Sequence, residues 1–127
     1  MKQEDKDLLL KDLCSRLPYG VKCDVGYNKP YTLCRIEIDS KNEHLLDFIE
    51  IIDDFDVQYY LCEVKPYLFP LSSMTEKQEQ EYINTCNGCC TYYWTDETFD
   101  YLNKNRFDYR GLIPKGLAND ATGLNIY

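Results

Sequence analysis

The chain has 127 residues, and its 22 acidic residues outnumber its 14 lysines and arginines, which gives a formal net charge of −8. This length fits one domain with its own core, and a hydrophobic fraction of 44% argues against disorder. The acidic balance argues against direct nucleic-acid binding, and no apolar run reaches the ~20 residues that cross a bilayer. We therefore expect a single domain over residues 1–127 without a membrane span.

Residues 4–17 have the spacing of an amphipathic helix. Leu10, Leu13 and Leu17 recur on one face, and Pro18 and Gly20 follow as stop signals. Acidic residues occupy the first turn, where the helix dipole favours anions. The acidic N-terminus has no signal-peptide core, and seven cysteines form an odd number, so we expect a cytoplasmic protein with reduced thiols.

Four strand-like runs follow the helix. They are rich in β-branched, aromatic or alternating apolar residues and span residues 21–27, 32–39, 44–52 and 57–64. The short links between them predict an antiparallel meander. Pro66 is expected to end the fourth run, and residues 66–71 are expected to form an irregular crossing.

Two helices are predicted in the C-terminal half. The first begins with a capping-box pattern at Ser73–Glu76 and ends near Cys86. The second begins at Thr95, where Trp94 and Phe99 suit a hydrophobic staple. The fold class is therefore α+β: an N-terminal helix, a four-stranded antiparallel β-meander and two C-terminal helices packed on one face.

The net charge is concentrated in one segment. Nine acids and one base lie between Glu37 and Glu63, whereas the remaining acids and bases cancel. The candidate partner-binding acids lie on the second strand and in the third turn: Glu37, Asp39, Asp53, Asp54 and Asp56. Successive turns of a meander lie at opposite ends of the sheet, so these acids form a band or two poles. They suit a basic partner, although a solvated sheet face explains the same charges.

Tyrosines and a basic tail supply further candidates for contact with a partner. Tyr92 and Tyr93 precede a tryptophan, and such residues are common at interfaces, although they also fill small cores. Arg106 and Arg110 lie in a tail that is the positive counterpart of the acidic segment. The tail either docks on the fold, with Arg110 paired to an acid, or contacts a partner, including a second copy in a homo-oligomer.

Cysteine spacing offers a second hypothesis, a small metal-binding module. Cys86 and Cys89 have C-x₂-C spacing, but the sequence holds no second such pair and His44 is its only histidine. A zinc site would therefore need further ligands from distant positions. No nucleophile–base pair or phosphate-binding glycine motif is present, and an enzyme of unrecognised type is the third hypothesis.

Three segments carry a resemblance to a known family. They are residues 8–22, 64–75 and 107–118, which include Leu17-Pro18-Tyr19-Gly20, Val64-Lys65-Pro66-Tyr67 and Leu112-Ile113-Pro114-Lys115-Gly116. They resemble a family of small proteins, without an established function, from gut Bacteroidales, their phages and mobile elements. The resemblance implies a bacterial cytoplasm and a phage or mobile-element gene, and it carries over no site residue. Residues 76–95 depart most from the family pattern.

These features lead to one working hypothesis. The chain is a non-enzymatic accessory protein that binds a protein partner through its acidic sheet edge and aromatic residues. Because acidic surfaces attract basic ones, the expected partner is a basic or nucleic-acid-binding protein.

Overall fold

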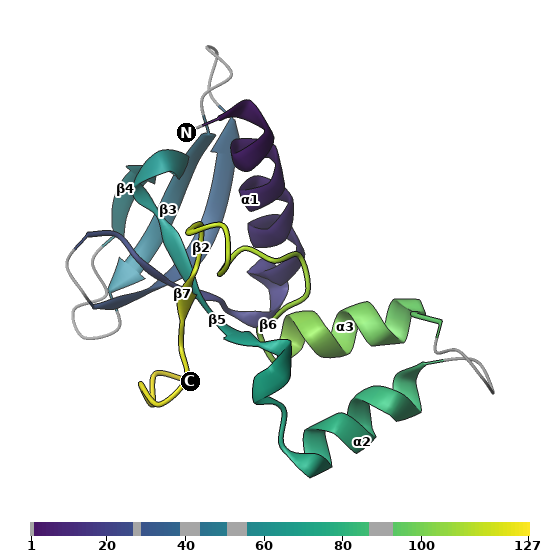
Figure 1. The fold of residues 1–127 in the computed structure, drawn as a ribbon. Helices are drawn as coiled ribbons and strands as arrows, with labels where there is room; N and C mark the ends of the chain where they lie inside the picture. Colours follow the sequence, from purple (N-terminus) through teal and green to yellow (C-terminus); the bar gives the residue numbers. More distant parts are fainter. Residues whose placement is uncertain (1, 27–28, 39–43, 51–55, 87–92) are drawn as a thin grey trace.

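In the described part of the chain, a mixed sheet and three α-helices build the fold (Figure 1). The computed structural model describes residues 2–26, 29–38, 44–50, 56–86 and 93–127, with backbone alone for residues 38, 44–50 and 56–58. The helices are α1 (Gln3–Arg16), α2 (Glu76–Thr85) and α3 (Asp96–Lys104). The strands are β1 (Lys22–Asp24), β2 (Pro30–Ile38), β3 (His44–Glu50), β4 (Asp56–Tyr60), β5 (Lys65–Pro70), β6 (Phe107–Asp108) and β7 (Asn119–Asp120).

The predicted antiparallel meander is present as the order β4-β3-β2-β1. The sheet then continues, because β5 pairs antiparallel with β1, and β6 and β7 each pair parallel with β5. The prediction of a purely antiparallel, four-stranded sheet is therefore only partly correct. The sheet is mixed and larger than the meander.

The segment predicted as an irregular crossing is the strand β5. Tyr67 and Leu68 on this strand are both buried. The strand is therefore a short apolar run and lacks the alternation of apolar and polar residues that a half-exposed strand has. Pro66 lies near its start and Pro70 at its end, two places where a missing N–H group disturbs few ladder bonds. Parallel neighbours complete the pairing, since Phe69 donates to the Arg106 carbonyl and Ala121 to the Leu68 carbonyl, both at 2.8 Å.

The predicted N-terminal helix is confirmed, and α1 covers the core beside the sheet (Figure 1). Leu9 and Leu13 are fully buried in one cluster with Val21, Cys23, Leu33, Leu68 and Leu112. A 3₁₀ turn at Leu17–Tyr19 then ends at Gly20, whose left-handed φ of 79° lets the chain turn into β1.

Both C-terminal helices form where predicted, with one shift in a cap. The capping box of α2 uses Thr75 and Gln78, two residues after the predicted pair. The cap of α3 is Thr95, and the Trp94 and Phe99 rings form the expected staple at 5.4 Å between centroids. None of the described helices is both long and apolar enough to cross a membrane.

The α2–α3 pair does not cover a face of the meander as predicted. It projects beyond the end of β5, with α2 against α3, and α3 against α1 and β6 (Figure 1). Its direction is set by β5, which leads away from the meander, and α1 already covers the core. The helix pair therefore stands out from the body of the protein.

Candidate interaction surface on the α2–α3 pair

Helix α2 contains no buried residue, although it has ten residues. An isolated helix of this length is marginal in water, so packing must hold it. Its described contacts are chiefly with α3, which buries Thr98, Leu102 and Asn103. One helix of the pair thus leaves most of its surface open to solvent.

Five aromatic residues lie on α2, on α3 and in the segments before and after α3, and we call them the aromatic surface: Tyr82, Tyr93, Trp94, Phe99 and Tyr109. Trp94 lies at the centre, with its ring edge-to-face to Tyr82, Phe99 and Tyr109 at centroid distances of 6.2, 5.4 and 5.8 Å. Such T-shaped contacts are favourable and fix the rings relative to one another. The Trp94 indole also donates a hydrogen bond to the Tyr82 hydroxyl at 2.7 Å.

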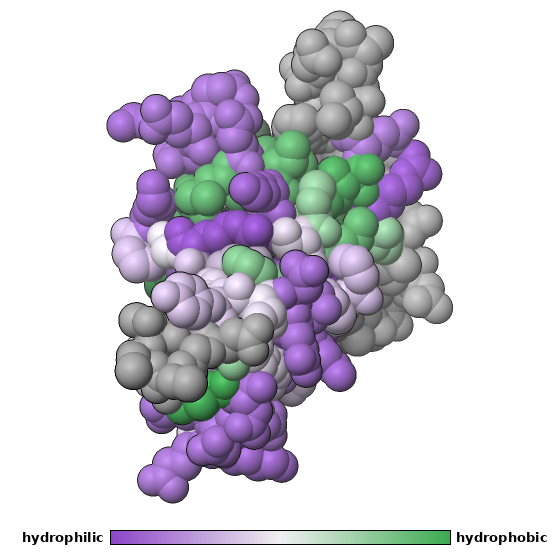
Figure 2. All heavy atoms as spheres, turned by 90° about the vertical axis from the view of Figure 1, so that its right-hand side faces the viewer, coloured by the Kyte–Doolittle hydropathy of each residue, from purple (hydrophilic) through white to green (hydrophobic). Residues whose placement is uncertain are grey.

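Three of these rings remain open to solvent, although Trp94 and Phe99 pack against each other. Tyr93 is 66% exposed, Phe99 39% and Trp94 37%. Figure 2 shows the side on which the helix pair projects, where residues of intermediate hydropathy form a pale zone across the middle. Rigid, partly exposed tyrosine and tryptophan rings are common binding anchors.

A buried ion network contacts the aromatic surface at Tyr109. The Arg16 guanidinium makes two bonds to the Asp12 carboxylate, at 2.8 and 3.0 Å, and donates to the Phe107 carbonyl at 2.7 Å. Arg110 donates to Asp12 at 3.1 Å. The two guanidinium carbons lie over the Tyr109 ring, 5.4 and 4.6 Å from its centroid. Tyr109 is thereby held between the core and the exposed rings.

The helices around these rings are acidic. They carry two lysines, Lys77 and Lys104, against six acids: Glu76, Glu79, Glu81, Asp96, Glu97 and Asp100. Burial, together with a hydrogen bond to Glu81, raises the pKa of Tyr101 to about 12. Burial also raises the pKa of Tyr82. Both hydroxyls therefore keep their protons at neutral pH, and the negative charge comes from the carboxylates alone.

The predicted acidic site is described only in part. Glu37 is exposed and forms an ion pair with Arg35 on the same strand. Asp39, Asp53, Asp54 and the Asp56 side chain lie outside the described residues. The strand ends that carry the acidic connections lie at opposite ends of β3, since Ile38 pairs with His44 and Ile49 with Asp56. Binding of a partner at these acids stays a prediction.

The predicted basic residues have partners within the fold. The Arg106 guanidinium donates to the carbonyls of Tyr19 and Gly20, at 3.0 and 2.9 Å. Arg110 bonds to Asp12 and to Ser15, so it pairs with an acid of α1. Tyr93 lies on the aromatic surface, and Tyr92 lies outside the described residues. These contacts place the tail against the body of the domain and leave its role toward a partner a prediction.

The possible metal ligands are not brought together in the described part of the chain. The Cys86 thiol is half-buried and donates to the Tyr82 carbonyl at 3.4 Å, while the Thr98 hydroxyl lies 3.9 Å from its sulfur. Cys89 and the His44 side chain lie outside the described residues. Among the residues described, no three His, Cys, Asp or Glu side chains are grouped so as to hold a metal ion.

Sequence reasoning found part of the aromatic surface and missed the rest. The staple pattern placed Trp94 beside Phe99, and tyrosine clustering pointed to Tyr93. Tyr82 and Tyr109 lie on other segments, and no local spacing links them to Trp94. Comparison of the chain with protein-family models, with curated proteins and with solved structures finds no match in any of the three.

Proposed function

We propose that this chain is a protein-binding module whose contact site is the aromatic surface of the α2–α3 pair. The observation that carries the proposal is the exposure of Trp94, Phe99 and Tyr93 on a helix pair that projects from the body. Large rings packed against one another lose little side-chain entropy on binding, so they supply contact area at low cost.

The chemistry around the rings defines the partner as a basic, partly apolar protein segment. Acids outnumber lysines on both helices, so lysine or arginine side chains of the partner gain favourable contacts at the rim. Arginine also stacks on exposed tryptophan and tyrosine rings. A nucleic-acid-binding protein has such segments, and the acidic sheet edge would add long-range attraction for it.

The test is capture of partners from the native host by wild-type protein and by the double variant Tyr93→Ala/Trp94→Ala. We expect the double variant to lose capture by about ten-fold or more, as is usual when anchor rings are removed. Capture by wild type should also weaken as salt rises from ~0.05 to ~0.5 M, because exposed charges are then screened.

Two matched variants locate the binding site. Leu124 is 51% exposed and lies in the C-terminal segment, so Leu124→Ala should leave capture unchanged. Tyr60 is 48% exposed at the end of β4, and Tyr60→Ala tests the sheet edge. If Tyr60→Ala abolishes capture while the double variant retains it, the aromatic surface is not the contact site.

Tryptophan fluorescence gives a second, direct readout. Trp94 is the only tryptophan of the chain, so its emission reports on this surface alone. A captured partner, once purified, should shift the emission to shorter wavelength and protect Trp94 from a soluble quencher. Binding without any change in Trp94 emission would contradict the proposal.

A further inference from the structure

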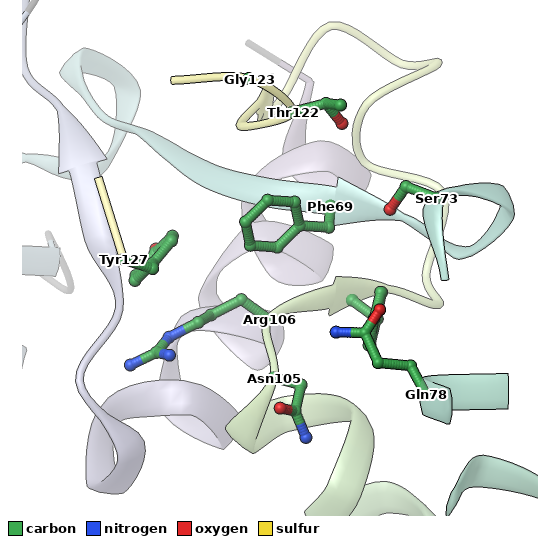
Figure 3. Close-up of a pocket in the computed structure, with 9 residues that line it drawn as sticks. Phe69, Ser73, Gln78, Asn105, Arg106, Thr122, Gly123 and Tyr127 are labelled. Carbon is green, nitrogen blue, oxygen red and sulfur yellow. The ribbon is translucent and has the colours of Figure 1, made fainter. Parts of the chain in front are cut away.

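A pocket of about 300 Å³ lies where the α2–α3 pair joins the body (Figure 3), and none of its lining residues belongs to the aromatic surface. Its walls come from six parts of the chain: β5, the 3₁₀ turn before α2, the first turn of α2, the segment after α3, β6 and the C-terminal segment. The lining residues are Phe69, Ser73, Gln78, Asn105, Arg106, Phe107, Thr122, Gly123 and Tyr127. This volume is at the lower end of the range for small-molecule sites.

The charge of this pocket is opposite to that of the protein. The chain has a formal net charge of −8, yet the lining residues include no acid and one cation, Arg106. The other three arginines each pair with a carboxylate: Arg16 and Arg110 with Asp12, and Arg35 with Glu37. No described carboxylate pairs with Arg106, whose partners are two backbone carbonyls. Arg106 therefore has no ion-pair partner among the described side chains.

The Arg106 side chain is also held in place before any ligand binds. Bonds to the Tyr19 and Gly20 carbonyls fix the guanidinium, and its carbon lies 4.2 Å from the centroid of the Tyr127 ring. No described residue accepts a hydrogen bond from its Nη1. Arg106 has a left-handed φ of 59° at the end of α3, a position that glycine usually takes. An arginine in this place supplies a fixed cation that glycine would not.

Aromatic rings form the wall beside this cation. The Phe69 ring lies 5.9 Å from Tyr127 and 6.3 Å from Phe107, measured between centroids. Figure 3 shows the Arg106 guanidinium on the same side of the pocket as Tyr127, and the Gln78 side chain, from α2, on the opposite side. Gln78 Oε1 accepts a bond from Thr75 N, and no described residue accepts from its amide NH₂ group. Hydrogen-bond donors and aromatic rings thus line the same pocket.

We infer that this pocket is a binding site for a small aromatic anion, a single planar ring that bears a carboxylate or a phosphate. The anionic group bonds to the Arg106 guanidinium, the ring packs against Phe69 and Tyr127, and Gln78 lines the opposite wall. Hydrogen bonds from a guanidinium to a carboxylate or phosphate are among the stronger ones in proteins, which favours an anion over a neutral ring. The site is separate from the proposed protein contact.

The test is a titration with benzoate, followed by amide chemical shifts in isotope-labelled protein. Benzoate should perturb the backbone signals of the lining residues, with phenyl phosphate as the second probe. Benzamide has the ring without the charge, and acetate has the charge without the ring, so both should bind at least about five-fold more weakly. Equal affinity for benzamide or acetate, or no perturbation of the lining residues by benzoate, would overturn the inference.

A substitution that adds one negative charge and preserves the fold distinguishes a local effect in the pocket from an effect of the net charge. In Gln78→Glu the new side chain still caps α2, because glutamate serves at this capping-box position as glutamine does. It places a negative charge in the pocket and should weaken benzoate binding by about five-fold or more. Gln80→Glu makes the same change on α2 outside the pocket lining and should stay within about two-fold of wild type. Equal weakening by both variants would contradict a site at Gln78.

Discussion

The Arg16 guanidinium lies 2.8 Å from the Asp12 carboxylate, one turn earlier on α1, and both side chains are fully buried. This pair joins three parts of the chain, because Arg16 also donates to the carbonyls of Leu102 and Phe107, and Arg110 donates to Asp12. It is the contact through which α1 holds the end of α3 and the segment that carries Tyr109.

Removal of the Asp12 carboxylate should destabilise the protein strongly. Asp12→Ala leaves Arg16 buried without a counter-charge, and such a change costs about 3–5 kcal/mol of unfolding free energy. Urea denaturation measures the loss. Asp7→Ala on the same helix removes an exposed carboxylate and should cost less than ~0.5 kcal/mol. A loss below ~1 kcal/mol in Asp12→Ala would show that Arg16 finds another partner or water.

The cap of α3 should contribute measurably to the stability of the helix pair. The Thr95 hydroxyl accepts a bond from Thr98 N at 3.3 Å and donates to the Thr85 carbonyl at 2.9 Å, which ties α3 to the end of α2. Thr95→Ala should cost about 1–2 kcal/mol by thermal or urea unfolding. Thr95→Ser keeps the hydroxyl and should retain most of that stability. Equal losses in the two variants would assign the effect to the methyl group.

Alkaline pH should destabilise the fold partly through Tyr101. The pKa of an unfolded tyrosine is ~10, whereas burial and the bond to Glu81 raise that of Tyr101 to about 12. Because the folded state keeps this proton longer, its contribution is fully present below pH ~10 and is lost as pH rises through about 12. Burial raises the pKa of Tyr127 as well, so its contribution is lost in the same direction.

Urea midpoints measured between pH ~9 and ~12 test this assignment. The variant Tyr101→Phe cannot ionise at this position, so its stability should fall less steeply with pH than that of wild type. It should also be less stable than wild type at neutral pH, since it loses the bonds to Gln78 O and Glu81, both at 3.1 Å. A pH slope equal to that of wild type would show that Tyr101 is not responsible.

Substitutions on the two sides of α3 should separate folding from binding. Leu102 is fully buried, and Leu102→Ala should cost about 2–5 kcal/mol through the cavity it leaves. Phe99 is 39% exposed, and Phe99→Ala should cost less, about 1–2 kcal/mol, while still weakening partner capture. Thermal unfolding followed by circular dichroism compares the two. If Phe99→Ala unfolds the domain, Phe99 belongs to the core.

Local features of the fold were accessible from the sequence. The boundaries of α1, the cap at Thr95 and the staple of Trp94 on Phe99 depend on residues within a few positions of one another. The β1–β4 order was equally accessible, because short links leave antiparallel neighbours as the simplest arrangement. The same reasoning failed at β5, where two prolines and a run of apolar residues obscured a strand buried in the sheet.

Long-range contacts were decided by the tertiary structure. The sequence by itself determined where α1 and α3 start, how the meander pairs and that the charge is acidic overall. Only the fold placed β6 and β7 on β5, gathered Tyr82 and Tyr109 around Trp94, and buried Arg16 on Asp12. These partners are distant in the chain or are selected by burial. The free energy of packing chooses among many such pairings, and no local spacing encodes that choice.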